Sequence, residues 1–549
     1  MRFEEKLKEC TKEEMWQEYC GFLDLTTEEF MEIQYRLMEE QIRLWSTSTL
    51  GKGILKGKHP KSVEDFKKMV PLTTYEDYAE ILLAKERSML PSEPVLWIET
   101  TWEGGAKPIK VAPYSKSMIQ TYQRNMVGCL MLSTSQGRGD FDVRAKETIL
   151  YGLAPLPYAT GLFPVLLNEE INMEFLPPVK EAEAMSFGER NKKGFKLGLE
   201  KGIDYFFGVG SVTYYVSKTL SSMGASKKKS SEKKAADTKT SGSVNPLGKV
   251  KMLLRLMKGK KKADEAERDL LPADLFQLKG FMCAGTDNRC YKDELEEQWG
   301  IRPMEIFAGT EPTCIGTEIW SRDGLYLFPD ACFYEFIPED EMDQPQPSTC
   351  LFDEVAVGEK YELVITVLKG GAFARYRVGD VYQCIGLENA KDETKLPRFE
   401  YIDRIPDVID IAGFTRITKT SIERIVQLSG LNVKEWTARK EFNENNKPFL
   451  HMYVEMNPET FLSKAVAVEV LREHLSIYFK YLDSDYKDLK RILGMEPLEI
   501  TILKIGTFQT YHDKYGAIRS INPKQHDIQE LVKCQKMQSG IVRKEHLYG

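Results

Sequence analysis

The feature that most constrains this chain is an alternation of short apolar runs with amphipathic stretches at helical spacing. Residues 95–101 (VLWIETT) have the β-branched content of a strand, and residues 115–131 follow a helical period with Ser115 or Ser117 as the N-cap. A further strand is predicted at 147–157. This strand–loop–helix–strand order is typical of an α/β fold. Other predicted elements are helices at 3–50, 75–90 and 291–300, strands at 275–285, 304–309, 360–367 and 380–387, and a hairpin at 325–338.

A second pattern begins near residue 405, where shorter helices and strands alternate in an α+β manner. A charged residue and a proline, Arg404 and Pro406, interrupt an extended stretch at this point. The sequence therefore predicts a large N-terminal α/β domain, residues 1–404, with mixed sheets and flanking helices. A small, mobile C-terminal α+β domain follows at 405–549.

Composition excludes several classes of protein. The net charge of −7 does not favour nucleic-acid binding. The sequence has no run of about 18 apolar residues, so we expect no membrane span. The charged N-terminus lacks the apolar core of a secretory signal. The ten cysteines include no CxxC pair, which favours reduced thiols and a cytoplasmic protein.

Residues 221–262 form a basic insertion that differs in composition from the rest of the chain. Its part from Ser226 to Lys262 holds twelve lysines and one arginine against two acidic residues. We expect a flexible surface insertion, whose second part (KVKMLLRLMKGKKK) is compatible with a short amphipathic helix. Such a helix would make a weak contact with an anionic membrane or an acidic partner. The alternative is a solvated loop without a partner.

Three stretches carry residues suited to nucleotide chemistry. In EIFAGTEP (305–312), Phe307 suits stacking on a base, Thr310 a phosphate contact, and Glu311 a Mg²⁺ ion. In FARYRVGDVY (373–382), Asp380 begins a predicted strand and suits a ribose diol, while a neighbouring arginine suits a phosphate or a carboxylate. The third stretch, 401–418, places an arginine at the predicted domain boundary. The first two stretches are also compatible with ordinary turns.

Residues 99–110 (ETTWEGGAKPIK) have the small residues and lysines of a phosphate-binding loop. Trp102 and Glu103, however, stand where such a loop has glycine and hydroxyl groups. By itself this loop is therefore a weak indication of a nucleotide site.

In this order, the stretches resemble the GH3 family of acyl-acid amido synthetases, of the bacterial type, within the adenylate-forming superfamily. The segment 307–382, from FAGTEP to FARYRVGDVY, carries the most specific part of the resemblance. The resemblance implies that a carboxylic acid reacts with ATP to give an acyl-adenylate, and that an amine, usually of an amino acid, then displaces AMP. It also implies a monomer that uses ATP and Mg²⁺ and acts on small molecules.

The resemblance implies a role for each matching residue. Glu311 matches the metal-side glutamate and Thr310 the phosphate-contacting hydroxyl, while Phe307 matches the adenine-stacking aromatic. Asp380 matches the ribose-binding aspartate, and Arg404 lies near the hinge arginine. In the loop, the phosphate-binding groups would be Thr100, Thr101, Gly104, Gly105 and either Lys107 or Lys110. From the C-terminal domain, the catalytic lysine would be Lys524, or Lys514 if the register differs by about one residue.

Three functions remain open at this point. The first is an ATP-dependent acid–amino acid ligase. The second is an adenylate-forming enzyme that makes an acyl thioester, hence an acyl-CoA ligase. The third is a non-catalytic acyl- or nucleotide-binding protein, which Trp102 and Glu103 in the loop would favour.

Overall fold

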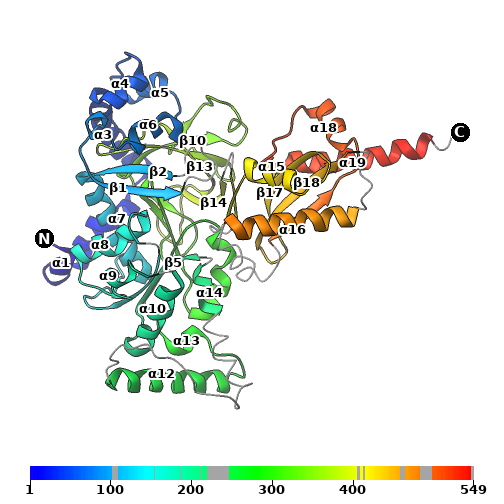
Figure 1. The fold of residues 1–549 in the computed structure, drawn as a ribbon. Helices are drawn as coiled ribbons and strands as arrows, with labels where there is room; N and C mark the ends of the chain where they lie inside the picture. The colour runs from blue at the N-terminus through cyan, green and yellow to red at the C-terminus, as the bar shows by residue number, and fades with distance from the viewer. Residues whose placement is uncertain are drawn as a thin grey trace. The chain divides into compact units, whose positions relative to one another are not determined.

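The computed structural model describes residues 1–549 except 102–108, 154, 186, 211, 215, 219–245, 405–407, 412–414, 458–463, 483–496 and 546–549. The chain divides into two compact units, one that includes residues 1–101 and 109–402 and one that includes residues 403–549. Their bodies are mixed α/β, as the sequence predicts (Figure 1). Among the described helices, none is long and apolar enough to cross a membrane.

The first unit is built on two larger sheets and one two-stranded ribbon. A seven-stranded sheet has the order β4-β3-β5-β6-β7-β8-β9, in which β4 to β7 pair in parallel and β7 to β9 antiparallel. Its strands are β3 (Thr148–Gly152), β4 (Glu174–Leu176), β5 (Tyr205–Val209), β6 (Gly280–Ala284), β7 (Met304–Gly309), β8 (Thr313–Thr317) and β9 (Tyr326–Leu327).

A five-stranded sheet of order β11-β10-β12-β13-β14 lies in the same part of the chain. Its strands are β10 (Cys332–Pro338), β11 (Cys350–Leu351), β12 (Lys360–Val367), β13 (Tyr376–Gly386) and β14 (Arg398–Arg404). The predicted hairpin at 325–338 is therefore wrong, because β9 pairs with β8 while β10 pairs with β11 and β12. The third sheet is the ribbon of β1 (Pro94–Thr101) and β2 (Ile109–Ser115).

Polar side chains cap the N-termini of several helices of the first unit. Ser115 accepts a hydrogen bond from the Met118 amide and starts the long helix α7, and Thr26 with Glu29 forms the capping box of α3. Figure 1 shows α3 to α6 at one end of this unit and α10, α12 and α13 at the other. The helices are α1 (Phe3–Glu9), α2 (Lys12–Tyr19), α3 (Thr27–Thr47), α4 (Thr49–Leu55), α5 (Val63–Met69), α6 (Ala79–Leu83), α7 (Lys116–Thr134), α8 (Leu162–Glu170), α9 (Val179–Ala182), α10 (Phe187–Lys201), α12 (Pro246–Glu265), α13 (Pro272–Leu275) and α14 (Lys292–Trp299).

One expectation about helices needs correction, and another is confirmed. Residues 75–90 do not form one helix: the short α6 lies between two 3₁₀ turns, and Lys85 has a left-handed φ of 55° that ends the helical path. The second part of the basic insertion, KVKMLLRLMKGKKK (249–262), is helical as expected and lies within α12. Residues 221–245 of that insertion lie outside the described part of the chain.

The second unit has a three-stranded sheet, β17-β18-β19, and a two-stranded ribbon, β15-β16. A cluster of apolar side chains, including Phe508 and Leu531, forms a core where α18 and α19 pack together. The elements are β15 (Val408–Ile411), β16 (Thr415–Thr418), α15 (Lys419–Leu428), β17 (Val433–Phe442), β18 (Pro448–Met456), α16 (Lys464–Leu482), β19 (Leu498–Ile502), α18 (Thr507–Tyr515) and α19 (Gln525–Glu545).

Candidate active site

The predicted phosphate loop connects the two strands of the β1–β2 ribbon. At its base, Thr100 pairs with Lys110, and Thr101 pairs with Ile109. The rest of the predicted loop, including Trp102, Glu103, Gly104, Gly105 and Lys107, lies outside the described residues. Of the predicted phosphate-binding groups, the two threonines and Lys110 are therefore the ones that the structure describes.

Lys110 joins this ribbon to two other predicted motifs. Its ammonium donates to Glu311 Oε1 at 2.9 Å and to the Tyr376 hydroxyl at 3.0 Å. The Tyr376 hydroxyl in turn donates to the same Glu311 oxygen at 2.7 Å. We call these three residues the Lys110 cluster; it connects the base of the loop, the turn after β7 and the start of β13.

The Lys110 cluster keeps Glu311 ionised although the residue is buried. Burial by itself would raise the pKa of the Glu311 carboxyl, but the Lys110 ammonium and the Tyr376 hydroxyl outweigh it and lower the pKa to about 2. Lys110 also lies 5.4 Å from the ring centre of Tyr75 and 5.7 Å from that of Tyr376, so aromatic faces support the cation.

The turn after β7 is held by a second tyrosine. The buried Tyr114 hydroxyl donates to the Thr310 carbonyl at 2.8 Å and lies 3.3 Å from that of Gly309. Thr313, just after the turn, has a left-handed φ of 67°. Glu311 and Thr310 are thereby fixed at the carboxyl end of β7, which pairs in parallel with β6. The crevice beyond such strand ends is the usual ligand site of α/β sheets.

Phe307 lies on β7, four residues before Glu311, and is half-buried. Its ring contacts the edge of Tyr382 with 5.4 Å between the centroids, and Tyr382 contacts Tyr401 in the same way at 5.7 Å. The structure therefore brings Phe307 close to β13, the strand that carries Asp380.

Asp380 lies at an irregularity of β13. The pairing with β12 shifts between Glu362 and Val364, and Gly379 at this bulge has a φ of 83°. A bulge reorients the side chains that follow it. Asp380 is fully buried, so a ribose can reach its carboxylate only after the structure around it opens.

The two arginines that flank Tyr376 bind carboxylates of the protein itself. Arg375 makes a two-point contact with Glu335, at 3.0 Å from Nε and 2.9 Å from its terminal nitrogen. Arg377 makes the same kind of contact with Glu362, at 2.9 and 2.5 Å. A phosphate or a carboxylate was expected to bind one of these arginines. In the structure both arginines bind carboxylates, which belong to neighbouring strands of the same sheet.

The remaining predicted residues belong to the second unit. Asn522 donates to the backbone oxygens of Arg404 at 3.0 Å and Val408 at 2.9 Å. Lys524 follows two residues later, is half-buried, and precedes α19. Lys514 is exposed near the end of α18. Within this unit, Asn522 thus brings the loop of Lys524 to the backbone of Arg404.

Two tyrosines of the site were not predicted from the sequence. Tyr376 stands inside the motif FARYRVGDVY, where the flanking arginines drew the functional assignment, and Tyr114 carries no signal of its own. In the described part of the chain, no group of three or more His, Cys, Asp or Glu side chains forms a metal cage. Glu311 is therefore a single ionised carboxylate with a cation and a hydroxyl on one of its oxygens.

Solved structures with this fold include an acyl acid amido synthetase and a CoA ligase. An "AtGH3.15 acyl acid amido synthetase in complex with 2,4-DB" superposes with a TM-score of 0.53 at 16% identity, over 95% of this chain and 96% of that one. A "2-Hydroxyisobutyryl-CoA Ligase (HCL) in complex with 2-HIB-AMP and CoA" gives a TM-score of 0.54 at 16% identity, over 95% and 94%. The fold is that of the adenylate-forming ligases, with a large N-terminal and a smaller C-terminal domain.

Two family models match the chain in order. The GH3 family N-terminal domain matches residues 20–143, and the GH3 family central domain matches residues 325–404. The matched segments are similar to domains of the GH3 family, in agreement with the resemblance carried by the motifs. The central match includes β13 and ends at Arg404.

Curated relatives are plant amido synthetases. The chain is 28% identical to a "Probable indole-3-acetic acid-amido synthetase GH3.9" of Oryza sativa subsp. japonica over 225 residues, which are 38% of this chain and 48% of that protein. It is 26% identical to the "Indole-3-acetic acid-amido synthetase GH3.3" of Arabidopsis thaliana over 235 residues, 40% of this chain and 36% of that protein. The match thus spans about half or less of the length of these relatives.

Proposed function

We propose that this protein is an ATP-dependent acid–amino acid ligase, which activates a small carboxylic acid as an acyl-adenylate and transfers the acyl group to an amine. The observation that carries the proposal is the Lys110 cluster. It joins the base of the predicted phosphate loop to a buried, ionised glutamate at the carboxyl end of β7. A cation and an anion fixed in this way suit a site where phosphate charge must be neutralised and positioned.

In this proposal each residue of the first unit has one task. Thr100, Thr101, Gly104 and Gly105 hold the phosphates, with Lys110 as the cation beside them. Phe307 stacks on adenine and Thr310 contacts phosphate. Asp380 binds the ribose once its surroundings open. Hydrogen bonds to a pre-positioned phosphate lower the barrier without reorganisation during the reaction.

We further propose Mg²⁺ as the metal that accompanies ATP. Mg²⁺ at nucleotide sites keeps several waters and binds one or two carboxylates together with phosphate oxygens. Glu311 fits this donor set, because it is ionised and its Oε2 takes no part in the contacts with Lys110 and Tyr376. The bound metal would polarise the phosphate. Glu311 then serves as the metal-side carboxylate, while Lys110 and Tyr376 hold it in one orientation.

The second unit, residues 405–549 in the proposed domain division, supplies a lysine to the reaction and moves between its two steps. Lys524 is the stronger candidate, since Asn522 in the same loop binds the backbone of Arg404 at the proposed hinge. Lys514 lies exposed near the end of α18. Arg404 contacts nucleotide in this proposal.

We assign the protein to the cytoplasm and to a monomeric state, with small-molecule substrates and no nucleic acid. The ten cysteines are all free thiols, which fits a reducing compartment. Its substrates are a carboxylic acid and an amino acid or another amine, as the names of the relatives suggest.

A second candidate is an acyl-CoA ligase, because the CoA ligase above shares the fold over nearly the whole chain. Pyrophosphate exchange with a panel of carboxylic acids tests both proposals, and we expect an acid-dependent exchange. Product analysis with amino acids or coenzyme A then distinguishes an amide from a thioester. An absence of exchange with every acid, together with retained ATP binding, would favour the non-catalytic alternative.

A further inference from the structure

Helix α12 presents a row of large apolar side chains to solvent. Their exposed fractions lie between 52% and 63%. An exposed apolar row of this length is unusual on the surface of a monomeric protein and marks an interaction site. We call it the α12 stripe; it consists of Leu247, Val250, Leu253, Leu254 and Met257.

The opposite face of α12 is fixed to the first unit. A side chain at Gly259 would meet Leu275 at 2.6 Å, and Ala263 is buried. Arg255 donates to the backbone oxygens of Gly198 and Leu199 at the end of α10. Because a single face makes these contacts, the stripe points away from the body of the unit, where Figure 1 shows α12 at its outer edge.

Lysines border the stripe on both sides. At about 100° per residue, the stripe covers an arc centred opposite Gly259 and Ala263. Lys249 and Lys260 fall on one margin of this arc, and Lys251, Lys258 and Lys262 fall on the other. An apolar strip between two rows of cations matches a surface with an apolar interior and an anionic boundary.

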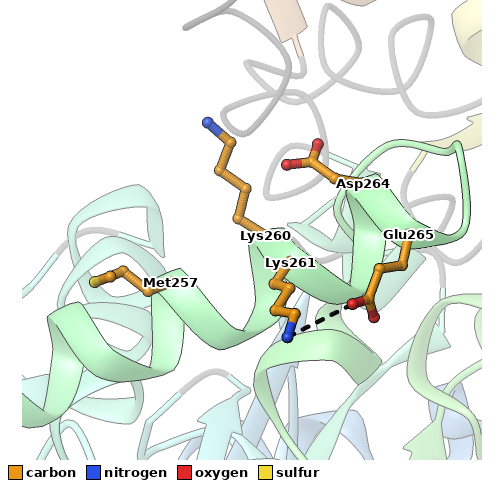
Figure 2. A pocket seen from close by; sticks show the side chains of 5 residues that line it. All are labelled: Met257, Lys260, Lys261, Asp264 and Glu265. Carbon is orange, nitrogen blue, oxygen red and sulfur yellow. Dashed lines mark ion pairs between the residues drawn. The ribbon is translucent and has the colours of Figure 1, made fainter.

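The C-terminal end of α12 limits this surface. A hollow of about 510 Å³ there is lined by Met257, Lys260, Lys261, Asp264 and Glu265, and Lys261 forms an ion pair of 3.7 Å with Glu265. Figure 2 shows these side chains and the ion pair. The two carboxylates come seven and eight residues after Met257, the last residue of the stripe. Up to Met257, all the charged residues of α12 are cations.

We propose that α12 binds the surface of an anionic lipid bilayer, with the stripe buried among the acyl-chain ends of the headgroup region and the flanking lysines on lipid phosphates. The helix lies in the plane of the bilayer and does not span it, because seven basic residues occur in its twenty. Long lysine side chains keep their charges at headgroup level while their carbon chains follow the apolar surface.

Two other occupants fit these observations less well. A second copy of the chain would bring two helices with excess positive charge together, and like charges repel at close range. An acidic protein would satisfy the lysines but would need an apolar groove for the stripe. A bilayer offers both properties on one flat surface and suits a straight helix at the outer edge of the unit.

The test is co-sedimentation of the full chain with vesicles of phosphatidylcholine alone or mixed with phosphatidylserine. We expect binding to the anionic vesicles only, and weaker binding as salt is raised. Replacing three stripe residues together (Leu253→Gln, Leu254→Gln, Met257→Gln) should lower the affinity by roughly tenfold or more, because the apolar contribution is lost at unchanged charge. The matched control is Val357→Gln, which removes a side chain of similar exposure, 57%, from the same unit and should leave binding unchanged.

Each contrary outcome overturns the proposal. Equal binding by the wild-type chain and the triple variant would mean that charge alone attracts the lipid. Light scattering that finds a dimer in solution, and a monomer for the triple variant, would assign the stripe to a second copy. Binding to polyglutamate as tight as to the anionic vesicles would favour an acidic partner. As a positive readout, Met257→Trp should show a blue shift of its emission with anionic vesicles and none with phosphatidylcholine.

Discussion

Glu311 depends on two residues that are distant in sequence. Lys110 is separated from it by 201 positions and Tyr376 by 65. Removing one partner of a buried ion pair leaves the other charge without compensation, which costs more than the pair contributes as a whole. Substitutions in this cluster therefore affect stability as well as chemistry, and a control with the same stability cost is needed.

Glu311→Gln should reduce pyrophosphate exchange by about 100-fold or more, because it removes the charge that positions the metal and its phosphates. It should also lower the free energy of unfolding by about 3–5 kcal/mol. Glu362→Gln breaks a comparable buried contact with Arg377 outside the proposed site and should show the stability loss with most of the exchange retained. An equal loss of exchange in both variants would remove Glu311 from the chemistry.

The same carboxylate makes a prediction about pH. Folding lowers the pKa of Glu311 from 4.5 to about 2, so the folded state favours the ionised form. Its stabilisation is complete above about pH 5 and is lost as pH falls from 4.5 towards 2. The difference in unfolding free energy between wild type and Glu311→Gln should therefore shrink between about pH 5 and pH 3 in urea titrations. A difference that grows on acidification would contradict this assignment.

Asp380→Ala should abolish ATP binding in calorimetric titrations, because the ribose diol would lose its acceptor. The control is Asp392→Ala, which removes another buried carboxylate, one that accepts a hydrogen bond from Asn389. Wild-type ATP affinity in the Asp380 variant would refute the ribose assignment.

At the scale of residues, the likeness of the motifs to a known family pointed to Glu311 and Asp380 as candidate site residues. It did not identify the side chains that fix them in place. The contact of Lys110 with Tyr376 spans 266 positions, and no local pattern in the sequence encodes such a distance. Trp102 and Glu103 lie outside the described residues, so their effect on the loop stays a prediction to be tested by Glu103→Thr, which should raise adenylation if the native charge is merely tolerated.

At the scale of elements, α7 owes its position to a close approach. A side chain at Gly128 would lie 2.6 Å from the backbone oxygen of Tyr19 in α2, and a backbone atom cannot move aside as a flexible side chain can. The glycine thus allows α7 and α2 to pack directly together.

Gly128→Ala should therefore lower the free energy of unfolding by about 1–3 kcal/mol through overpacking. Gly53→Ala, in α4, is the matched control, since nothing lies within 4 Å of the added group. It should stabilise by about 0.5–1 kcal/mol because alanine has less freedom to lose on folding. Urea unfolding followed by circular dichroism measures both. An unchanged midpoint for Gly128→Ala would show that the helices can separate without cost.

Elements with strong local signals could be predicted from the sequence, such as α7 with its serine cap. The supposed hairpin at 325–338 could not, because its turn residues specify a change of direction and not the strand with which each arm pairs. Tertiary context decides that pairing. The broken helix at 75–90 has the same origin: apolar spacing fits both an α-helix and successive 3₁₀ turns, and Lys85 in its left-handed conformation decides between them.

At the scale of the whole molecule, the chain consists of two units, and the predicted site residues are distributed over both. The change in element density near residue 405 led to the prediction of a domain boundary there, which stays a prediction. The identity of the C-terminal lysine was not predictable, because motif register alone left two lysines open. The hydrogen bonds of Asn522 favour Lys524.

Lys524→Ala should lower pyrophosphate exchange by about 100-fold or more, as expected when a charge that stabilises a transition state is removed. Lys514→Ala is the control and should retain most of the exchange, since that side chain is exposed on α18. Circular dichroism should show both variants folded. The reverse ranking would assign the reaction to Lys514.

The misassigned hairpin has a consequence for how the first unit opens. Phe328 donates from its amide to Ile315 in β8 at 2.8 Å, and its carbonyl accepts from the Tyr334 hydroxyl of β10 at 2.7 Å. One short connection thus fastens the two large sheets to each other. Their amides should exchange with solvent deuterium as one cooperative group rather than sheet by sheet. A change in conditions should therefore alter the exchange protection of the motifs on β7 and on β13 to the same extent.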